Sequence, residues 1–244
     1  MTKPGAQSIR IRFSKAGRVR FVSHRDVARL FERALRKLRL PVAYTEGFSP
    51  RPKLSFGLAL TVAHESEAEY LDVELFEPID LGALPAELTD ALPDGMTVDA
   101  VINIEPGTPS LQQAIVSCDW RIELLGTTPD ALTAAVADVL AAAELPLERV
   151  RKGQTTVADV RPAILHLEVA GPTVDGVELY AQLATESVSL RPSELVRTLD
   201  AALDDELVEG RVRRTHQWMI VDGSRCEPVS PPGPSTRHRL PRAS

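Results

Sequence analysis

The sequence is poor in cysteine, in aromatic residues and in long apolar runs. Cys118 and Cys226 are the only cysteines among 244 residues. They are too few for a disulfide framework, a zinc site or an iron–sulfur cluster, which takes about four cysteine ligands. No apolar stretch is long enough to span a bilayer, and the first residues, MTKPGAQSIR, contain no apolar signal core. These absences predict a reduced, cytoplasmic protein with no metal or cofactor of its own and no membrane partner.

Motifs that identify common enzymes are absent as well. The chain has no GxxxxGK[ST], GxGxxG, HExxH, GxSxG or CxxC. Aromatic residues make up 5% of the chain, which is too few for a sheet that stacks and reads single-stranded bases. The sequence therefore points to no established catalytic mechanism, and it favours a protein that is not an enzyme.

The charged residues that are present are unevenly distributed. The formal net charge is −6, which by itself argues against a nucleic-acid partner. Residues 1–55, however, contain 14 lysines and arginines against 3 acidic residues, whereas residues 56–149 contain 2 against 18. A strongly basic surface can therefore exist in an acidic protein.

Hydrophobic periodicity predicts a mixed order of strands and helices. Residues 9–13 and 18–22 alternate between apolar and basic side chains, which is typical of a β-hairpin or a long bulged strand. Residues 24–40 have helical spacing that ends at Pro41. Further strands are expected at 41–44, 53–60, 69–76, 96–104, 115–124, 147–152, 163–170, 177–184 and 211–221. Further helices are expected at 84–92, 129–143 and 193–203.

Each half of the chain thus has the order β-α-β-β-α-β. This order predicts an α+β fold of tandem ferredoxin-like units with antiparallel sheets. The expected domains are residues 1–109 and 110–226, and the Pro- and Ser-rich residues 227–244 are expected to form a disordered tail. A single α+β domain with one continuous sheet is the alternative.

The run SHRD at residues 23–26 predicts the start of the first helix. Ser23 occupies the expected N-cap position and Asp26 follows three residues later, as in a capping box. Capping does not explain His24, whose imidazole could contact a ligand or act as an acid or base near neutral pH. His24 is therefore the candidate catalytic residue, and a structural or merely exposed histidine is the alternative.

Arginines form two arrays in the basic segment. The predicted helix carries a stripe of cations opposite its apolar side, formed by Arg25, Arg29, Arg33, Arg36 and Lys37. The strands carry a second array, formed by Arg10, Arg12, Arg18 and Arg20. Either array could bind phosphate. Solvent could equally surround the stripe, and the acidic residues 56–149 could neutralise the strand array, so the sequence leaves these alternatives open.

The stretch YTEGFSPRPKLSFG, residues 44–57, combines stiffness with positive charge. Pro50 and Pro52 fix the backbone on both sides of Arg51, and Gly47 allows a turn. Arg51 and Lys53 are spaced to project from the same side. The candidate ligand-binding residues of the chain are accordingly Arg25, Arg29, Arg33, Tyr44, Phe48, Arg51 and Lys53. For the two aromatic rings, packing in the core is expected of at least one.

These motifs resemble the radical-SAM-linked protein family. This is a bacterial domain of unknown function that occurs alone or fused to cobalamin-binding-type radical SAM proteins. The matching positions are Ser23, His24, Asp26, Gly47, Phe48, Pro50, Arg51, Pro52, Lys53, Glu65, Ser66 and Glu69. His64 stands where many members have glycine. The resemblance covers residues 8–80 and implies a radical SAM protein as partner, because this chain lacks the cysteines for radical chemistry. Family members' genes lie near those of ribonucleases and ribosomal proteins, which implies work on RNA or ribosomes.

Residues and resemblance together predict an accessory protein that binds RNA or another substrate and acts with a radical SAM enzyme. One alternative is a metal-independent ribonuclease or RNA-modifying enzyme that uses His24. The repeat-processing CRISPR endoribonucleases share the expected architecture, but their glycine-rich loop is reduced here to Gly210. A further alternative is a protein-interaction scaffold without RNA.

Overall fold

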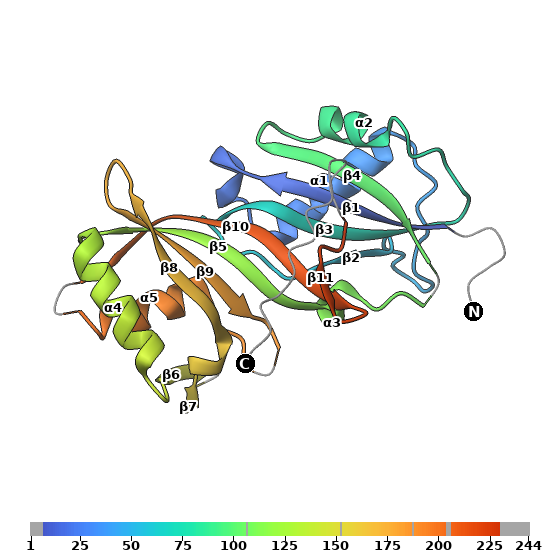
Figure 1. The fold of residues 1–244 in the computed structure, drawn as a ribbon. Helices are drawn as coiled ribbons and strands as arrows, with labels where there is room; N and C mark the ends of the chain where they lie inside the picture. The colour runs from blue at the N-terminus through green and yellow to red at the C-terminus, as the bar shows by residue number, and fades with distance from the viewer. Residues whose placement is uncertain (1–6, 106, 152, 187, 204–205, 230–244) are drawn as a thin grey trace. The chain divides into compact units, whose positions relative to one another are not determined.

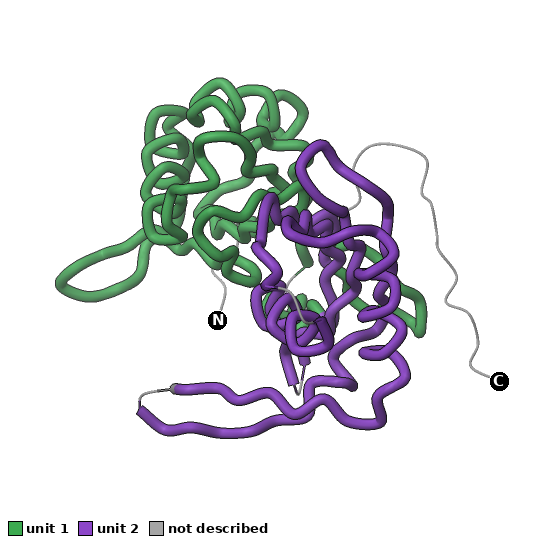
Figure 2. Tube along the Cα trace, turned by 90° about the vertical axis from the view of Figure 1, so that its left-hand side faces the viewer, with its two compact units in different colours: residues 1–115, 218–244 green, residues 116–217 purple. Residues whose placement is uncertain are grey.

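A computed structural model describes residues 7–105, 107–151, 153–186, 188–203 and 206–229. The chain divides into two compact units (Figure 2). Unit 1 comprises residues 1–115 and 218–244, and unit 2 comprises residues 116–217. The structure is mixed α/β with mostly antiparallel strand pairs. Among the described residues, no helix has the length and apolar character needed to cross a membrane.

Unit 1 is built on a sheet in the order β4-β1-β3-β2 (Figure 1). Its strands are β1 (Gln7–Lys15), β2 (Leu54–Phe56), β3 (Glu65–Leu75) and β4 (Met96–Ile104). Its helices are η1 (Gly17–Phe21), α1 (His24–Lys37), α2 (Leu84–Ala91) and α3 (Leu111–Ala114). Each neighbouring pair in this sheet is antiparallel. The short strand β11 (Ser224–Cys226) pairs with the last residues of β10 (Val208–Val221).

The core of unit 1 lies between the sheet and its two longer helices. Ile9, Ile11 and Phe13 alternate along β1 and are at most 1% exposed. The ring of Phe13 meets the ring of Phe31 from α1 edge to face, with centroids 4.7 Å apart. Leu84 of α2 belongs to the same cluster, so α1 and α2 cover the same face of β1. The alternation predicted from the sequence therefore produces this core.

Unit 2 has a sheet in the order β10-β5-β9-β8. Its strands are β5 (Ile115–Leu125), β6 (Pro146–Arg151), β7 (Gln154–Asp159), β8 (Ile164–Pro172) and β9 (Val177–Ala184). Its helices are α4 (Pro129–Ala141), η2 (Arg161–Ala163) and α5 (Pro192–Asp200). The strands β6 and β7 form a separate hairpin, of which the sequence predicts only the first strand.

The predicted strand at residues 18–22 is wrong, because the chain forms the 3-10 helix η1 there. Gly17 adopts φ +66°, and its backbone N–H donates to Glu65 Oε1 at 3.0 Å. The buried ammonium of Lys15 donates to the carbonyls of Arg20 and Val22 at 3.2 and 2.8 Å. These contacts curl the segment into a turn, and the local alternation of Arg and apolar residues does not reveal them.

The predicted tail falls largely on residues 230–244, which lie outside the described residues. Its first residues are part of unit 1. Val229 is 2% exposed, and Glu227 accepts a hydrogen bond from the Tyr70 hydroxyl at 3.2 Å. The packed chain therefore extends a few residues beyond the predicted boundary at 227.

Candidate functional site

Residues 44–52 form a closed hairpin between α1 and β2, which we call the cationic hairpin. Tyr44 and Pro52 pair across its base. Thr45 donates its N–H to the Arg51 carbonyl at 2.9 Å, and Arg51 donates its N–H to the Thr45 hydroxyl at 3.0 Å. Because the two prolines lack N–H donors, these bonds through Arg51 are the ones that close the hairpin.

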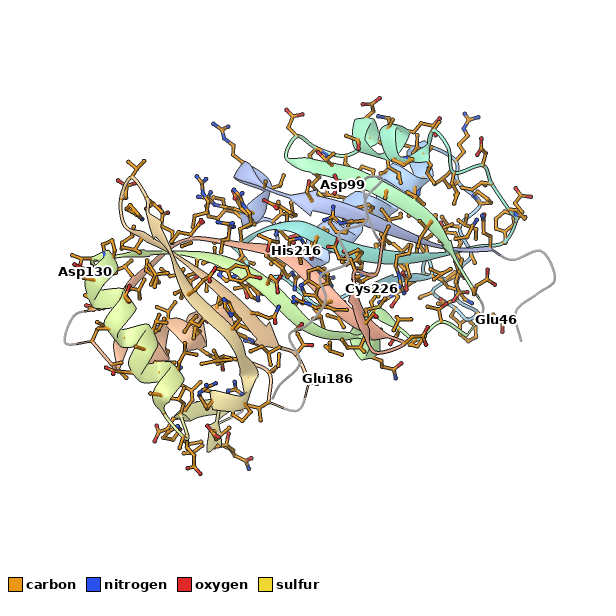
Figure 3. All side chains as sticks on the ribbon, in the orientation of Figure 1. Glu46, Asp99, Asp130, Glu186, His216 and Cys226 are labelled. Atoms are coloured by element: carbon orange, nitrogen blue, oxygen red, sulfur yellow. The ribbon has the colours of Figure 1, made fainter. Side chains whose placement is uncertain are left out.

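The tip of the cationic hairpin is open to solvent. Gly47 has φ +120°, and a Cβ added to it would meet no atom within 4 Å, so glycine serves the turn itself. Phe48 is fully exposed, Tyr44 is 49% exposed and Arg51 is exposed. The prediction that at least one of the two rings packs in the core is therefore wrong, since both residues are exposed. Glu46, labelled in Figure 3, lies in the same segment.

Lys53 lies just beyond the hairpin and differs from Arg51 in its surroundings. Its ammonium is 2.6 Å from Glu74 Oε2, and both side chains are roughly half exposed. The backbone N–H of Lys53 donates to the Ala43 carbonyl at 2.8 Å. A surface ion pair of this kind is weak, so Lys53 remains available to a ligand. That ligand would have to compete with Glu74 for the ammonium.

The N-terminus of α1 is capped as the sequence predicts. Ser23 Oγ accepts from the Asp26 N–H at 3.2 Å and donates to Asp26 Oδ2 at 2.7 Å. Arg29 donates to Asp26 Oδ1 at 2.9 Å. These hydrogen bonds lower the pKa of the Asp26 carboxyl, and the bond from Ser23 has the larger effect. Ser23 and Asp26 thus fix where α1 begins.

His24 is the first residue of α1 and is exposed. Its ring meets the ring of Phe56 from β2 at a centroid distance of 5.1 Å, and Phe56 in turn contacts Phe31. Aromatic packing therefore accounts for the position of His24. A catalytic role of its imidazole stays a prediction.

The cations of α1 lie on the side of the helix opposite its buried residues Val27, Phe31, Ala34 and Leu35. Arg25, Arg33, Arg36 and Lys37 are all exposed. Within the described parts of the chain, Arg29 is the member of the stripe that forms an ion pair, with Asp26. The other members are exposed and form no ion pair with a described acidic side chain, and like charges at this spacing repel one another.

Two of the four predicted strand arginines, Arg10 and Arg12, have the opposite surroundings. Arg18 and Arg20 lie in η1 instead, where Arg18 is exposed and Arg20 Nη1 is 3.5 Å from Glu65 Oε1. Arg10 is 2% exposed and makes a two-pronged contact with Asp72, Nε to Oδ1 at 2.7 Å and Nη2 to Oδ2 at 2.9 Å. Arg12 reaches Asp99 Oδ2 at 2.8 Å, and Asp99 comes from β4 (Figure 3). Burial raises the pKa of Asp99 against the opposing attraction of Arg12. Carboxylates from the acidic residues 56–149 thus neutralise Arg10 and Arg12. This is the alternative to phosphate binding that the sequence left open for the strand arginines.

Three buried charged groups on the sheet, Lys15, Glu65 and Glu69, were not identified from the sequence as partners. Lys15 is 3% exposed, and burial lowers its pKa while the charge of Glu69 opposes that shift. Glu69 is 8% exposed on β3, and Glu65 holds Gly17. The run ESEAE at residues 65–69 therefore supports the turn that leads into α1. In the sequence, the only indication of this structural role was that the acidic run at residues 65–69 follows a strongly basic segment.

The two ends of α1 meet different parts of the chain. His24 lies against Phe56, whereas Tyr44 and Pro52, at the base of the cationic hairpin, border a cavity with the C-terminal residues of α1. A helix of this length is roughly 20 Å long. The candidate residues Arg25 and Arg29 therefore lie well away from Tyr44, along one cationic side of the helix.

A family model described as "Uncharacterized protein conserved in bacteria (DUF2344)" matches residues 8–203. No curated protein matches the sequence. Similar solved structures include a Cbf5–Nop10–Gar1 complex, at 13% identity and a TM-score of 0.48, and an H/ACA RNP bound to a substrate RNA, at 10% and 0.43. Both matches cover 86% of this chain, which spans about half of the matched chains, 48% and 47%. Likeness at this level supports no argument about function.

Proposed function

We propose that the chain, which belongs to the bacterial family DUF2344, acts as an RNA-binding accessory protein. The observation that carries the proposal is the contrast between the two sets of arginines. Arg10 and Arg12 are paired with the chain's own carboxylates. Among the exposed cations in the described part of residues 1–55, seven form no ion pair, and all of them except Arg18 lie on α1, just after it or on the cationic hairpin: Arg18, Arg25, Arg33, Arg36, Lys37, Arg39 and Arg51.

Unneutralised arginines along one helix favour an anionic partner with repeated charges. Their mutual repulsion is relieved when phosphate groups lie beside them, and a guanidinium binds a phosphate through two parallel hydrogen bonds. Six such contacts would make the affinity fall on the order of a thousandfold between 50 and 200 mM salt. The exposed ring of Phe48 offers a stacking surface next to Arg51.

The partner we propose is a radical SAM enzyme, on the basis of the resemblance of residues 8–80 to the radical-SAM-linked family. Cys118 is buried and Cys226 is half-buried, and two cysteines are too few to hold an iron–sulfur cluster. Radical chemistry would accordingly lie in the partner, and this chain would present the RNA to it.

We also infer that the two halves are tandem ferredoxin-like units. The strand orders β4-β1-β3-β2 and β10-β5-β9-β8 support this inference, since each places the first and third strands of its half at the centre. The hairpin of β6 and β7 would then be an insertion after α4. The proposed domains are those expected from the sequence, residues 1–109 and 110–226.

Filter binding with tRNA and rRNA fragments over a salt series tests the RNA proposal. The double variant Arg25→Gln/Arg33→Gln removes two cations of α1. It should weaken binding and reduce the slope of log affinity against log salt by about 1.4. The matched control Arg121→Gln/Arg211→Gln removes two exposed arginines of unit 2 and should leave the slope unchanged.

Absence of salt-sensitive binding, or an equal loss in the control, would overturn the proposal. A pull-down of the radical SAM protein with and without nuclease distinguishes the scaffold alternative. Capture that survives nuclease treatment, together with no RNA binding by the isolated chain, would favour a scaffold.

A further inference from the structure

A small cavity lies where the C-terminal end of α1 meets the base of the cationic hairpin. Its volume is about 130 Å³, and Arg36, Arg39, Tyr44, Pro52 and Glu32 are among its lining residues. A volume of this size equals about four water molecules. It suits one tetrahedral oxyanion, and it is well below the roughly 300 Å³ at which pockets for whole nucleosides or cofactors begin.

Arg39 occupies a backbone position that favours glycine. Leu38 is the C-cap of α1, and Arg39 follows it with φ +54°. The N–H of Arg39 donates to the Arg36 carbonyl at 3.0 Å, and that of Leu40 to the Leu35 carbonyl at 3.1 Å. These two bonds make a Schellman motif, in which the left-handed residue is usually glycine. An arginine is less stable there than glycine, because its Cβ crowds the following carbonyl.

Arg36 and Arg39 both line this cavity. Neither forms an ion pair with an acidic side chain in the part of the chain that the structure describes. Glu32 lines the same cavity one turn before Arg36, a spacing that can orient the Arg36 side chain. Tyr44 also lines this cavity, and it is 49% exposed.

Two effects oppose anion binding at this place. The charge of Glu32 is negative, and the carboxyl end of a helix carries a partial negative charge. The C-terminal motif of α1 satisfies the carbonyls of Leu35 and Arg36, which reduces the second effect. Direct charge-assisted hydrogen bonds from two guanidiniums are stronger than either a screened carboxylate or a helix end, so the balance favours an anion.

We propose that Arg36, Arg39 and Tyr44 form a subsite for one phosphate group. The cavity holds the phosphate oxygens between the two guanidiniums, and the Tyr44 ring lies beside whatever the phosphate is attached to. The need for a side chain at this cavity also explains an arginine at the left-handed position 39. That the phosphate belongs to RNA rests on the proposed function, whereas binding of the phosphate group itself does not.

Inorganic phosphate and adenosine monophosphate, titrated into the full chain at constant ionic strength, test the subsite. The readout is the NMR signal of each arginine Nε–H. The signals of Arg36 and Arg39 should shift and saturate with both probes, but not with adenosine. The variants Arg36→Gln and Arg39→Gly should each weaken binding by about tenfold, the effect of one charge-assisted hydrogen bond. The control Arg211→Gln removes an exposed arginine of unit 2 that does not line this cavity, and it should bind phosphate as the native chain does.

Arg39→Gly separates loss of binding from loss of folding, because glycine suits the left-handed backbone. Its thermal midpoint should equal or exceed that of the native chain while phosphate binding falls. Unchanged phosphate affinity in this variant, or signals of Arg36 and Arg39 that fail to saturate, would overturn the subsite.

Oligoribonucleotides with and without a 5′-phosphate identify the source of the phosphate. If the chain prefers the phosphorylated strand and Arg39→Gly loses this preference, the subsite binds the phosphate at a strand end. If the chain binds both strands equally and Arg39→Gly weakens both, the subsite binds an internal phosphate. Saturable phosphate binding without RNA binding would support the subsite and refute the proposed function. RNA binding that depends on Arg25 and Arg33 but not on Arg39 would support the proposed function and refute the assignment of the bound phosphate to RNA.

Discussion

The ion pair of Arg10 and Asp72 gives the sharpest test of the distinction between arginines that stabilise the fold and arginines that are available to a ligand. Arg10 is 2% and Asp72 17% exposed as side chains, and the two make paired hydrogen bonds of 2.7 and 2.9 Å. The variant Arg10→Met keeps the aliphatic stem and removes the guanidinium, which leaves Asp72 charged and unpaired. Breaking a buried pair typically costs roughly 3–5 kcal/mol, and because Asp72 can be partly rehydrated we expect about 3 kcal/mol.

Hydrogen exchange of β1, combined with urea denaturation, measures this loss within unit 1, since the two units need not unfold together. The double variant Arg10→Met/Asp72→Leu should recover most of the stability, because an apolar pair can replace a buried ion pair. The exposed cross-strand pair of Arg121 and Glu178, at 2.9 Å with 53% and 25% exposure, is the control. Arg121→Met should cost less than about 1 kcal/mol. Equal small losses in both variants would refute the reasoning.

Two further predictions concern backbone geometry and pH. Gly95→Ala should cost at least about 2 kcal/mol, because φ is +90° and the new Cβ would lie 2.4 Å from the Ala16 carbonyl oxygen. Gly107→Ala, at φ +88° with no atom within 4 Å, should cost only about 1 kcal/mol, and equal urea midpoints would contradict the clash. Burial raises the pKa of Tyr70 above its ordinary 10.0. Above about pH 10 the unfolded chain therefore loses this proton before the folded chain does, and stability falls with rising pH. Tyr70→Phe should show a smaller fall in urea denaturation, and an identical fall would exclude Tyr70 as its cause.

Local patterns in the sequence predict most helices and strands, because the periodicity of apolar residues within each element is set by neighbours in the chain. The strand at Met96–Ile104 and the strand at Val177–Ala184 have the bounds that alternation predicts. The same reasoning is wrong at residues 18–22, where alternation is also present. Here Glu65, 48 positions away, holds Gly17, and such a distant contact leaves no trace in local periodicity.

In the candidate site, too, some features follow from local sequence and others only from tertiary contacts. Pro50, Pro52 and Gly47 are sufficient to predict a stiff turning hairpin, because they act through their own backbone angles. The cavity beside Tyr44 was not predicted. It depends on the left-handed backbone of Arg39 and on where the hairpin returns to α1, and neither follows from residue spacing.

The sequence by itself determined the amphipathic helix, its capped start, its cationic side and the stiffness of the cationic hairpin. Each of these follows from neighbours within about four residues. Only the tertiary structure decided which cations remain available. Arg10 and Arg25 are alike in sequence, yet one is buried against Asp72, 62 positions away, and the other faces solvent. The physical reason is that pairing of charges depends on strand register and burial, which are properties of the folded chain.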